Sequence, residues 1–292
     1  MIVPFSIYFD DKEYLERVYH KGQDKIWDGR EVLDELLNKY PDVEFNEAQA
    51  TALKNILAII LWGEYAAWNI SSEMSAKFDE QGAKMAAVSQ AHDEARHFYV
   101  MKDYLEKRLS YKPKTILTPA LRVLERVSQT TSIAKKLLGL QLMIEPVAIT
   151  IFRFLRKSNI DPALSELLEY YEKDEARHIA LGVKYLPKLI KKMPFLERAS
   201  FSVWQIKLIL FEIKGLKCIE DDLEVLNIDP KSVFEFAEKK QIACLKEVSS
   251  EMGIGEKIWK PVIRIININK KLTFYPHKDH SILKRVFVSV FD

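Results

Sequence analysis

Two copies of one five-residue motif carry the side chains in this sequence that are best suited to bind metal. The pentapeptide Asp-Glu-Ala-Arg-His occurs at residues 93–97 and again at residues 174–178. In each copy a glutamate and a histidine stand three residues apart, so on a helix they project from one face. Such a pair can bind one metal ion through an oxygen and a nitrogen. The two pairs are Glu94 with His97 and Glu175 with His178.

A further glutamate precedes each motif at the same distance. Glu64 lies thirty residues before Glu94, and Glu145 lies thirty residues before Glu175. Adding eighty-one to each position of the first set gives its counterpart in the second, which indicates a duplicated pair of helices. Glu64 and Glu145 both follow runs of apolar residues, and a carboxylate on a buried face needs a compensating partner. Solvated charges on amphipathic helices, the alternative, do not account for these runs.

The combined set of four carboxylates and two imidazoles is that of a dinuclear metal centre inside a four-helix bundle. We expect the same six residues to be the metal ligands and the catalytic residues: Glu64, Glu94, His97, Glu145, Glu175 and His178. By symmetry, one ion takes Glu64 and His97, the other takes Glu145 and His178, and Glu94 and Glu175 bridge. Four carboxylates neutralise two divalent ions, and so many hard oxygen ligands favour iron or manganese over zinc or copper.

The remaining charged residues of the motifs suit a supporting role around the ligands, namely Asp93, Asp174, Arg96 and Arg177. A metal-bound imidazole usually donates its other N–H to a carboxylate that orients the ring. In a two-fold arrangement Asp93 would bind His178 and Asp174 would bind His97, and the two arginines would balance the aspartates. The alternative is that each Asp–Arg pair is an ordinary ion pair along its own helix.

Composition narrows the class of protein. The chain has 292 residues, 48% of them hydrophobic, and a formal net charge of +2, so it can fold around a core and gives no case for binding nucleic acid. Only 9 glycines and 11 prolines favour long helices. Cys218 and Cys244 lack a metal or disulfide spacing, as in a reducing cytoplasm. We expect a cytoplasmic protein with no signal peptide and no membrane span, because the longest apolar stretch, residues 56–62, is far shorter than a span.

The helical periodicity divides the chain into four parts. These are a helical extension over residues 1–45, the metal-binding bundle over 46–194, additional packing helices over 195–268 and a basic tail over 269–292. Asn46 and Asp161 are the predicted N-caps of the first and fourth bundle helices. Val88 is expected on the inner face of the second, and Pro146 predicts a kink in the third, beside Glu145.

The paired Asp-Glu-x-Arg-His motifs and their upstream glutamates resemble the ferritin-like diiron-carboxylate superfamily. The resemblance covers residues 46–194 and is strongest to the oxygen-activating branch, which includes ribonucleotide reductase small subunits, bacterial multicomponent monooxygenase hydroxylases and acyl-carrier-protein desaturases. It implies an all-α, ferritin-like four-helix bundle with a crossover connection and additional C-terminal helices. Met101 stands where the reductase subunits have a radical tyrosine, Ile149 where the hydroxylases have a threonine, and Tyr171 where N-oxygenases have a histidine.

The resemblance implies an oxidoreductase with two iron ions, or manganese and iron, that uses O2 to oxidise, hydroxylate or desaturate a small, mainly apolar organic substrate. The expected pocket residues lie near the ligands and are apolar: Ile60, Ala67, Leu142, Ile149 and Phe152. The alternative is a ferritin-like or rubrerythrin-like protein that oxidises iron or scavenges peroxide. The partners considered are a ferredoxin or reductase, an acidic carrier protein docked on the basic tail, and a second copy of the chain in a homodimer.

Overall fold

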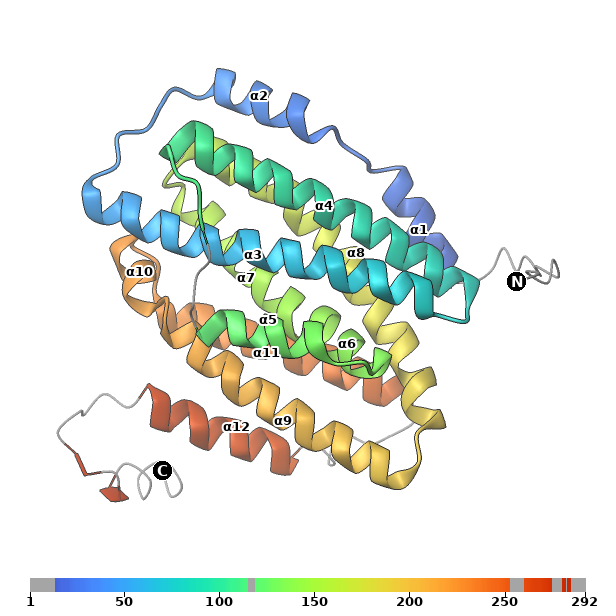
Figure 1. Cartoon of the computed structure of the whole chain (residues 1–292). Helices are drawn as coiled ribbons and strands as arrows, with labels where there is room; N and C mark the ends of the chain where they lie inside the picture. The colour runs from blue at the N-terminus through green and yellow to red at the C-terminus, as the bar shows by residue number, and fades with distance from the viewer. Residues whose placement is uncertain (1–13, 115–118, 253–259, 275–279, 282, 285–292) are drawn as a thin grey trace.

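The computed structural model describes residues 14–114, 119–252, 260–274, 280–281 and 283–284, and this part of the chain contains helices and no strand. Three long helices and one composite element form the bundle (Figure 1). The helices are α3 (Glu47–Lys77), α4 (Gln81–Leu109) and α8 (Pro162–Lys192). The composite element, called the third element because it precedes α8 in the chain, consists of α6 (Ile133–Leu137), the π-helical segment η1 (Leu138–Ile144) and α7 (Glu145–Ser158). Helix α3 packs along α4, and α7 packs along α8. The predicted all-α, ferritin-like bundle is confirmed.

The sequence sets the ends of the bundle helices locally. The side chain of Asn46 accepts a hydrogen bond from the Gln49 N–H, and the Gln49 side chain accepts one from the Asn46 N–H, which caps α3. Asp161 accepts from the Ala163 N–H at the start of α8. Both predicted N-caps are confirmed. Helices α4 and α7 end at Ser110 and Asn159, which adopt left-handed φ angles of 48° and 50°.

The third element is irregular immediately before Glu145, one of the expected metal ligands. Pro146 has no N–H to donate, and the turn before it is wound as a π-helix in which the Glu145 N–H bonds to the Leu140 carbonyl, five residues back. The sequence predicts a proline kink at this place, and the structure has a π-helical segment. Since a π turn holds more residues than an α turn, side chains before and after Glu145 no longer share a face at α-helical spacing.

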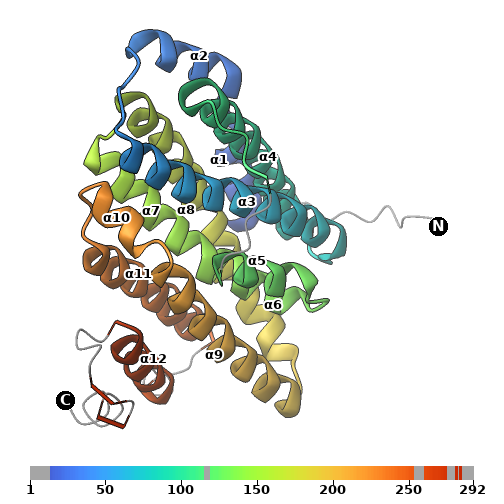
Figure 2. The ribbon, with the colours of Figure 1, turned by 60° about the vertical axis from the view of Figure 1, so that its left-hand side comes forward.

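The other helices cover the bundle on two sides. Helices α1 (Tyr14–Gln23) and α2 (Gly29–Lys39) pack on α4 and α8, and α5 (Pro119–Gln129) is the crossover helix. Helices α9 (Phe195–Lys217), α10 (Glu220–Val225), α11 (Pro230–Glu251) and α12 (Lys260–Thr273) lie together on the opposite side (Figures 1 and 2). Helix α12 continues beyond residue 268 to Thr273, so the expected boundary between the packing helices and the basic tail of residues 269–292 falls inside this helix. Residues 1–13 and much of that tail lie outside the described residues.

The core consists of two apolar layers with a polar layer between them. On α3, Leu61 and the buried residues before it belong to one cluster, and Ala67 and those after it belong to the other. The same change of cluster occurs on α4 between Ala87 and Val100, between Met143 of η1 and Ile151 of α7, and on α8 between Tyr171 and Leu181. Each bundle helix therefore carries its motif residues at the level where the apolar layers separate.

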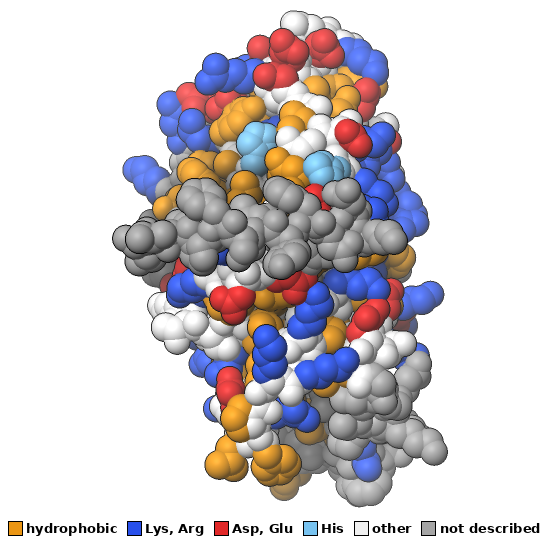
Figure 3. Space-filling view, turned by 90° about the vertical axis from the view of Figure 1, so that its right-hand side faces the viewer, with side chains coloured by type: hydrophobic (Ala, Val, Ile, Leu, Met, Phe, Trp, Pro, Cys, Tyr) orange, Lys and Arg blue, Asp and Glu red, His pale blue; other side chains and the backbone are white. Residues whose placement is uncertain are grey.

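Two surface features bear on the sequence-based expectations. Val88 is 53% exposed, so its expected place on the inner face is wrong; Ala87 and Gln90 face inward instead. The stretch 133–158 is long and apolar enough to cross a membrane, but 72% of its most apolar window is buried inside the protein and it carries Glu145, as a core helix does. On the face in Figure 3, basic and acidic side chains are intermingled.

Candidate metal centre

Six buried side chains converge at the middle of the bundle. Glu64 comes from α3, Glu94 and His97 from α4, Glu145 from the start of α7, and Glu175 and His178 from α8. Their ligand atoms form two groups, within each of which all the atoms lie within 4.8 Å of one another. One group is Glu64, Glu94, His97 and Glu175; the other is Glu94, Glu145, Glu175 and His178. Glu94 and Glu175 belong to both groups, as bridging carboxylates must.

The contacts of His97 within the cluster fit a shared cation better than hydrogen bonds. His97 Nδ1 lies 3.3 Å from Glu175 Oε1, 3.5 Å from Glu64 Oε2 and 3.6 Å from Glu94 Oε2. Even so, His97 Nδ1 and Glu94 Oε2 are both buried without a hydrogen-bond partner. Neighbouring ligands of one small divalent ion, with bonds of about 2.1 Å, stand about 3 Å apart. The donor set and its spacing therefore fit a dinuclear centre.

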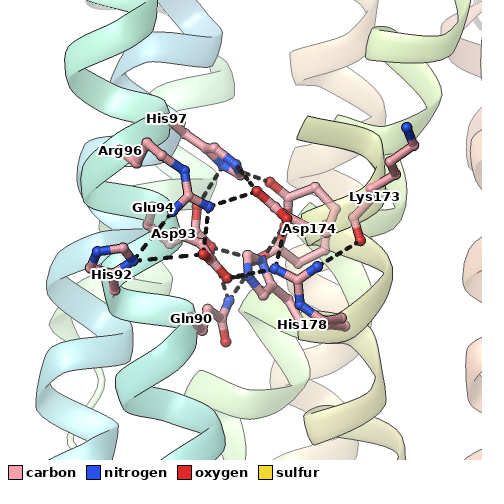
Figure 4. A network of polar contacts seen from close by, with 12 residues as sticks. Gln90, His92, Asp93, Glu94, Arg96, His97, Lys173, Asp174 and His178 are labelled. Carbon is pink, nitrogen blue, oxygen red and sulfur yellow. Dashed lines mark hydrogen bonds and ion pairs between the residues drawn. The ribbon is translucent and has the colours of Figure 1, made fainter. Parts of the chain in front are cut away.

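A closed ring of ion pairs lies behind the two histidines (Figure 4). Arg96 Nη2 donates to Asp93 at 2.6 Å and to Asp174 at 2.8 Å, and Arg177 Nη2 donates to Asp93 at 3.0 Å and to Asp174 at 2.6 Å. The ring nitrogens Nε2 of His97 and His178 contact Asp174 and Asp93 at 3.1 and 3.3 Å. These are the cross-helix pairs expected from two-fold symmetry, and they fix the direction of each Nδ1.

Burial and the neighbouring charges determine which groups hold protons. Burial raises the pKa of Glu64 and of Glu145 well above the ordinary value. Burial alone would lower the pKa of His97 and His178, but the surrounding carboxylates outweigh it and raise both well above the usual range. Burial would also raise the pKa of Asp93, yet the hydrogen bond from His178 and nearby positive charges hold it far below that range. Metal ions must therefore displace protons from the cluster when they bind.

Four further residues support the centre and were not predicted for this role. Gln90 donates to Glu94 at 3.0 Å and to Glu145 at 2.9 Å, and Gln141 donates to Gln90. On the other half, the Tyr171 ring stacks on His97 with centroids 4.1 Å apart, and its hydroxyl donates to the His97 carbonyl. Trp27 of the loop before α2 donates to Asp174 at 2.9 Å. Gln90 and Tyr171 each stand four residues before a motif glutamate, one helical turn, so spacing could have identified both.

A cavity of about 110 Å³ adjoins the centre. Glu64, Glu145 and Glu175 contribute to its wall, together with apolar side chains of α3 and α7. The opposite wall comes from α5, from α9 and from Ile219, just before α10. One more carboxyl group, Glu212 of α9, lines it. Glu212 was not predicted, although it follows the apolar run 208–211, the same signal that identified Glu64 and Glu145.

The expected pocket residues divide into two groups. Ile60, Ala67 and Phe152 line the cavity, whereas Leu142 and Ile149 do not. Leu142 is fully buried in the apolar layer beside Gly182. The π-helical winding accounts for Leu142, because it moves a residue three positions before Glu145 away from the ligand face and brings Ile144 to the cavity instead.

A family model of methane/phenol/alkene hydroxylases matches residues 7–192. No curated protein sequence matches the chain. Among solved structures, a protein from Synechococcus with aldehyde deformylating oxidase activity has a TM-score of 0.62 at 14% identity, covering 75% of this chain and 97% of that one. A putative class I ribonucleotide reductase from Bacillus halodurans has a TM-score of 0.66 at 13% identity, covering 85% and 95%. An R2-like ligand-binding oxidase variant with an Fe/Fe cofactor has a TM-score of 0.63 at 14% identity, covering 82% and 94%. At these identities the structures show a shared fold.

Proposed function

The chain belongs to the methane/phenol/alkene hydroxylase family, and we propose that it is an O2-dependent oxidoreductase acting on a small, mainly apolar organic molecule. One observation carries the proposal: Glu64, Glu145 and Glu175 belong both to the metal-binding cluster and to the wall of the apolar cavity. A molecule in that cavity would lie directly against the centre. Binding sites for small molecules are typically apolar hollows with a few polar groups.

The proposed centre holds two ions through the six converging side chains, with Glu94 and Glu175 shared. Two iron ions, or manganese with iron, suit the ligands, and variants of the R2-like oxidase carry an Fe/Fe or a Mn/Fe cofactor. When bound, such a pair of ions supplies the electrons and the O2 chemistry that the side chains cannot.

The side chains of the protein prepare the site for this chemistry. His97 and His178 give up their protons as the ions bind, and Asp174 and Asp93 hold the rings in the orientation that binding needs. Gln90 orients Glu94 and Glu145 from one side. The apolar wall around Ile60 and Phe152 limits the entry of water, which protects reactive species from side reactions.

The competing function, iron oxidation or peroxide scavenging, has less support. The cavity beside the cluster is lined mainly by apolar side chains, which suits an organic substrate better than a hydrated iron ion. A ferredoxin or reductase as electron donor, an acidic carrier protein, a homodimer and a cytoplasmic location remain predictions from the sequence.

The test uses full-length protein loaded anaerobically with Fe(II), supplied with a chemical reductant, O2 and cyclohexane. We expect close to two iron ions per chain and an oxidised cyclohexane product detected by gas chromatography and mass spectrometry. The matched control is Gly63→Leu. A Cβ at Gly63 meets no atom within 4 Å, so the larger side chain can fill the cavity while the ligands stay in place. This variant should keep its iron and lose the product.

Two results would overturn the proposal. One is an iron content near zero or one per chain. The other is sustained oxidation of many added Fe(II) ions with growth of a ferric mineral and no organic product, which would assign the centre to iron handling instead.

A further inference from the structure

Glu212 is a buried carboxyl group in the cavity wall that the metal centre does not account for. It is 7% exposed and comes from α9, across the cavity from the bundle helices. Its described hydrogen bond is the one that Gln241 Nε2 donates to Oε2 at 2.7 Å. The same Gln241 amide donates to the Met143 carbonyl at 2.9 Å, which fixes its position. The second oxygen, Oε1, therefore has no described hydrogen-bond partner, and Glu212 lines the cavity.

No cation in the described part of the chain is paired with Glu212. The charged groups that the bundle helices α3, α7 and α8 present to the cavity are the carboxyl groups of Glu64, Glu145 and Glu175, and α5 presents apolar side chains. Glu212 also lines a second, smaller cavity of about 50 Å³, in which Lys270 of α12 pairs with Glu238 of α11. An ionised Glu212 would therefore be buried without a compensating charge, at high cost.

Burial raises the pKa of Glu212 to about 8, although the hydrogen bond from Gln241 lowers it in part. Near neutral pH the side chain is mainly the uncharged acid. Because Oε2 accepts from Gln241, the acid proton is placed on Oε1, which has no described partner. A buried donor without a partner costs free energy, so the site gains when a ligand supplies an acceptor.

Glu212 belongs to the later part of the chain. It lies beyond residue 192, where the family match ends. Helix α9 approaches α5 closely here. A Cβ added to Gly215 would lie only 3.1 Å from the Cα of Ala120. Glu212 and Gly215 stand three residues apart, so they share one helix face. The close approach thus fixes the distance of Glu212 from the bundle.

From this arrangement we propose that Glu212 is a specificity-determining residue that donates a hydrogen bond to an oxygen atom of the substrate. The inference rests on the proposed function and deepens it. It predicts that the preferred substrate is a small, mainly apolar molecule with one neutral acceptor group, such as a carbonyl or hydroxyl, rather than a plain hydrocarbon. The cavity of about 110 Å³ is somewhat smaller than the roughly 150 Å³ that admits benzene, so a six-carbon skeleton is near its limit.

The test compares two probes of nearly equal shape, cyclobutanone and methylenecyclobutane, which are smaller than benzene and differ by an oxygen in place of a CH2 group. Binding to the full-length, Fe(II)-loaded protein is measured without O2, from the loss of probe vapour above the solution. Three variants accompany the wild type: Glu212→Gln keeps a donor, Glu212→Leu removes it, and Gly63→Leu fills the cavity. In Glu212→Leu one N–H of the Gln241 amide keeps its bond to Met143 and the other loses its acceptor, so binding of the apolar probe serves to show that this variant is folded.

We expect the wild type and Glu212→Gln to bind cyclobutanone about five-fold more tightly than methylenecyclobutane, the usual gain from one hydrogen bond. Glu212→Leu should lose this preference and still bind methylenecyclobutane, which shows that it is folded. Gly63→Leu should bind neither probe. Equal binding of both probes by the wild type, or a preference that survives in Glu212→Leu, would overturn the role of Glu212 and leave the proposed function intact. Binding of neither probe by the wild type would count against the cavity itself, and so against both proposals.

Discussion

The two walls of the cavity differ in the partners that surround their buried carboxyl groups. On the bundle wall, the carboxyl groups of Glu64 and Glu175 lie 3.5 and 3.3 Å from His97 Nδ1, and that of Glu145 lies 3.9 Å from His178 Nδ1. On the outer wall, Glu212 has a single amide as its described partner. Ionised groups are stable in the interior only where opposite charge compensates them. The first wall therefore carries a cluster of carboxyl groups and histidines that can exchange protons for cations, whereas the second wall holds a single neutral acid.

Glu212 and the three glutamates of the bundle wall also come from different parts of the chain. The bundle wall comes from the duplicated segment within residues 7–192, which matches the family model. Glu212 comes from the part beyond it. We infer that the metal chemistry is the property shared with the family, and that the choice of substrate depends more on the outer wall. The predictions below test the contrast, beginning with the largest expected effect.

Removing a shared carboxylate should abolish metal binding at the bundle wall. Glu94→Ala and Glu175→Ala should each lose both ions, because each residue belongs to both ligand groups. Glu64→Ala should weaken mainly one ion. Elemental analysis after anaerobic Fe(II) loading measures the result, and Glu47→Ala, at the exposed start of α3, is the control. Retention of one ion by Glu94→Ala would contradict the bridging assignment.

The neutral acid of the outer wall should appear as a pH-dependent loss of stability. The unfolded chain loses the Glu212 proton near pH 4.5, but the folded protein keeps it up to about pH 8. The stabilising contribution is therefore complete below pH 4.5, falls as the pH rises to 8, and is constant above it. The span corresponds to roughly 4 to 5 kcal/mol.

Urea unfolding of chelator-treated protein at pH 5, 7 and 9 measures this effect. Glu212→Gln has the same other ionisable groups, so its difference from the wild type isolates Glu212. The variant should gain relative stability between pH 5 and 9. Parallel stability profiles for the two proteins would show that Glu212 is ionised in the folded state. The outer wall would then not hold a neutral acid.

Asp→Asn substitutions in the ring of ion pairs should have smaller effects than the loss of a shared carboxylate. Asp174→Asn and Asp93→Asn should each lower metal affinity by about 10- to 100-fold, the usual cost of losing the carboxylate behind a metal-bound imidazole. Asp174→Asn should have the larger effect, because Asp174 Oδ2 accepts from Trp27, Arg96 and His97. Competition with a chelating dye measures both affinities. Equal metal affinity in wild type and both variants would mean that the aspartates serve only to balance the arginines.

The ligand set could be predicted from the sequence because the motif is duplicated and each ligand pair is local. Glu94 and His97 share a helix face at a spacing of three residues wherever that helix lies. The N-caps Asn46 and Asp161 were equally predictable, since a cap depends only on the next few residues. Helix α10 was not predicted, and Val88 was placed on the wrong face, because burial depends on neighbours that periodicity alone does not specify.

The pocket residues show where prediction from spacing along one helix fails. Ile60, Ala67 and Phe152 were predicted from their distance along a helix to a ligand, and they line the cavity. Leu142 was predicted in the same way, but the π-helical segment before Pro146 changes the rotation per residue and turns it away. Tyr171 was considered only for the histidine it replaces, yet it stacks on His97, a ligand from another helix.

The sequence by itself determined the chemistry that this protein can hold, because four glutamates and two histidines in a duplicated helical spacing can converge only if the helices form a bundle. Tertiary structure decided what lies next to that chemistry. Gln90 and Trp27 reach the centre, and Glu212 faces the cavity, through contacts between helices far apart in the chain. Such contacts depend on how whole helices pack, and packing is a property of all their side chains together.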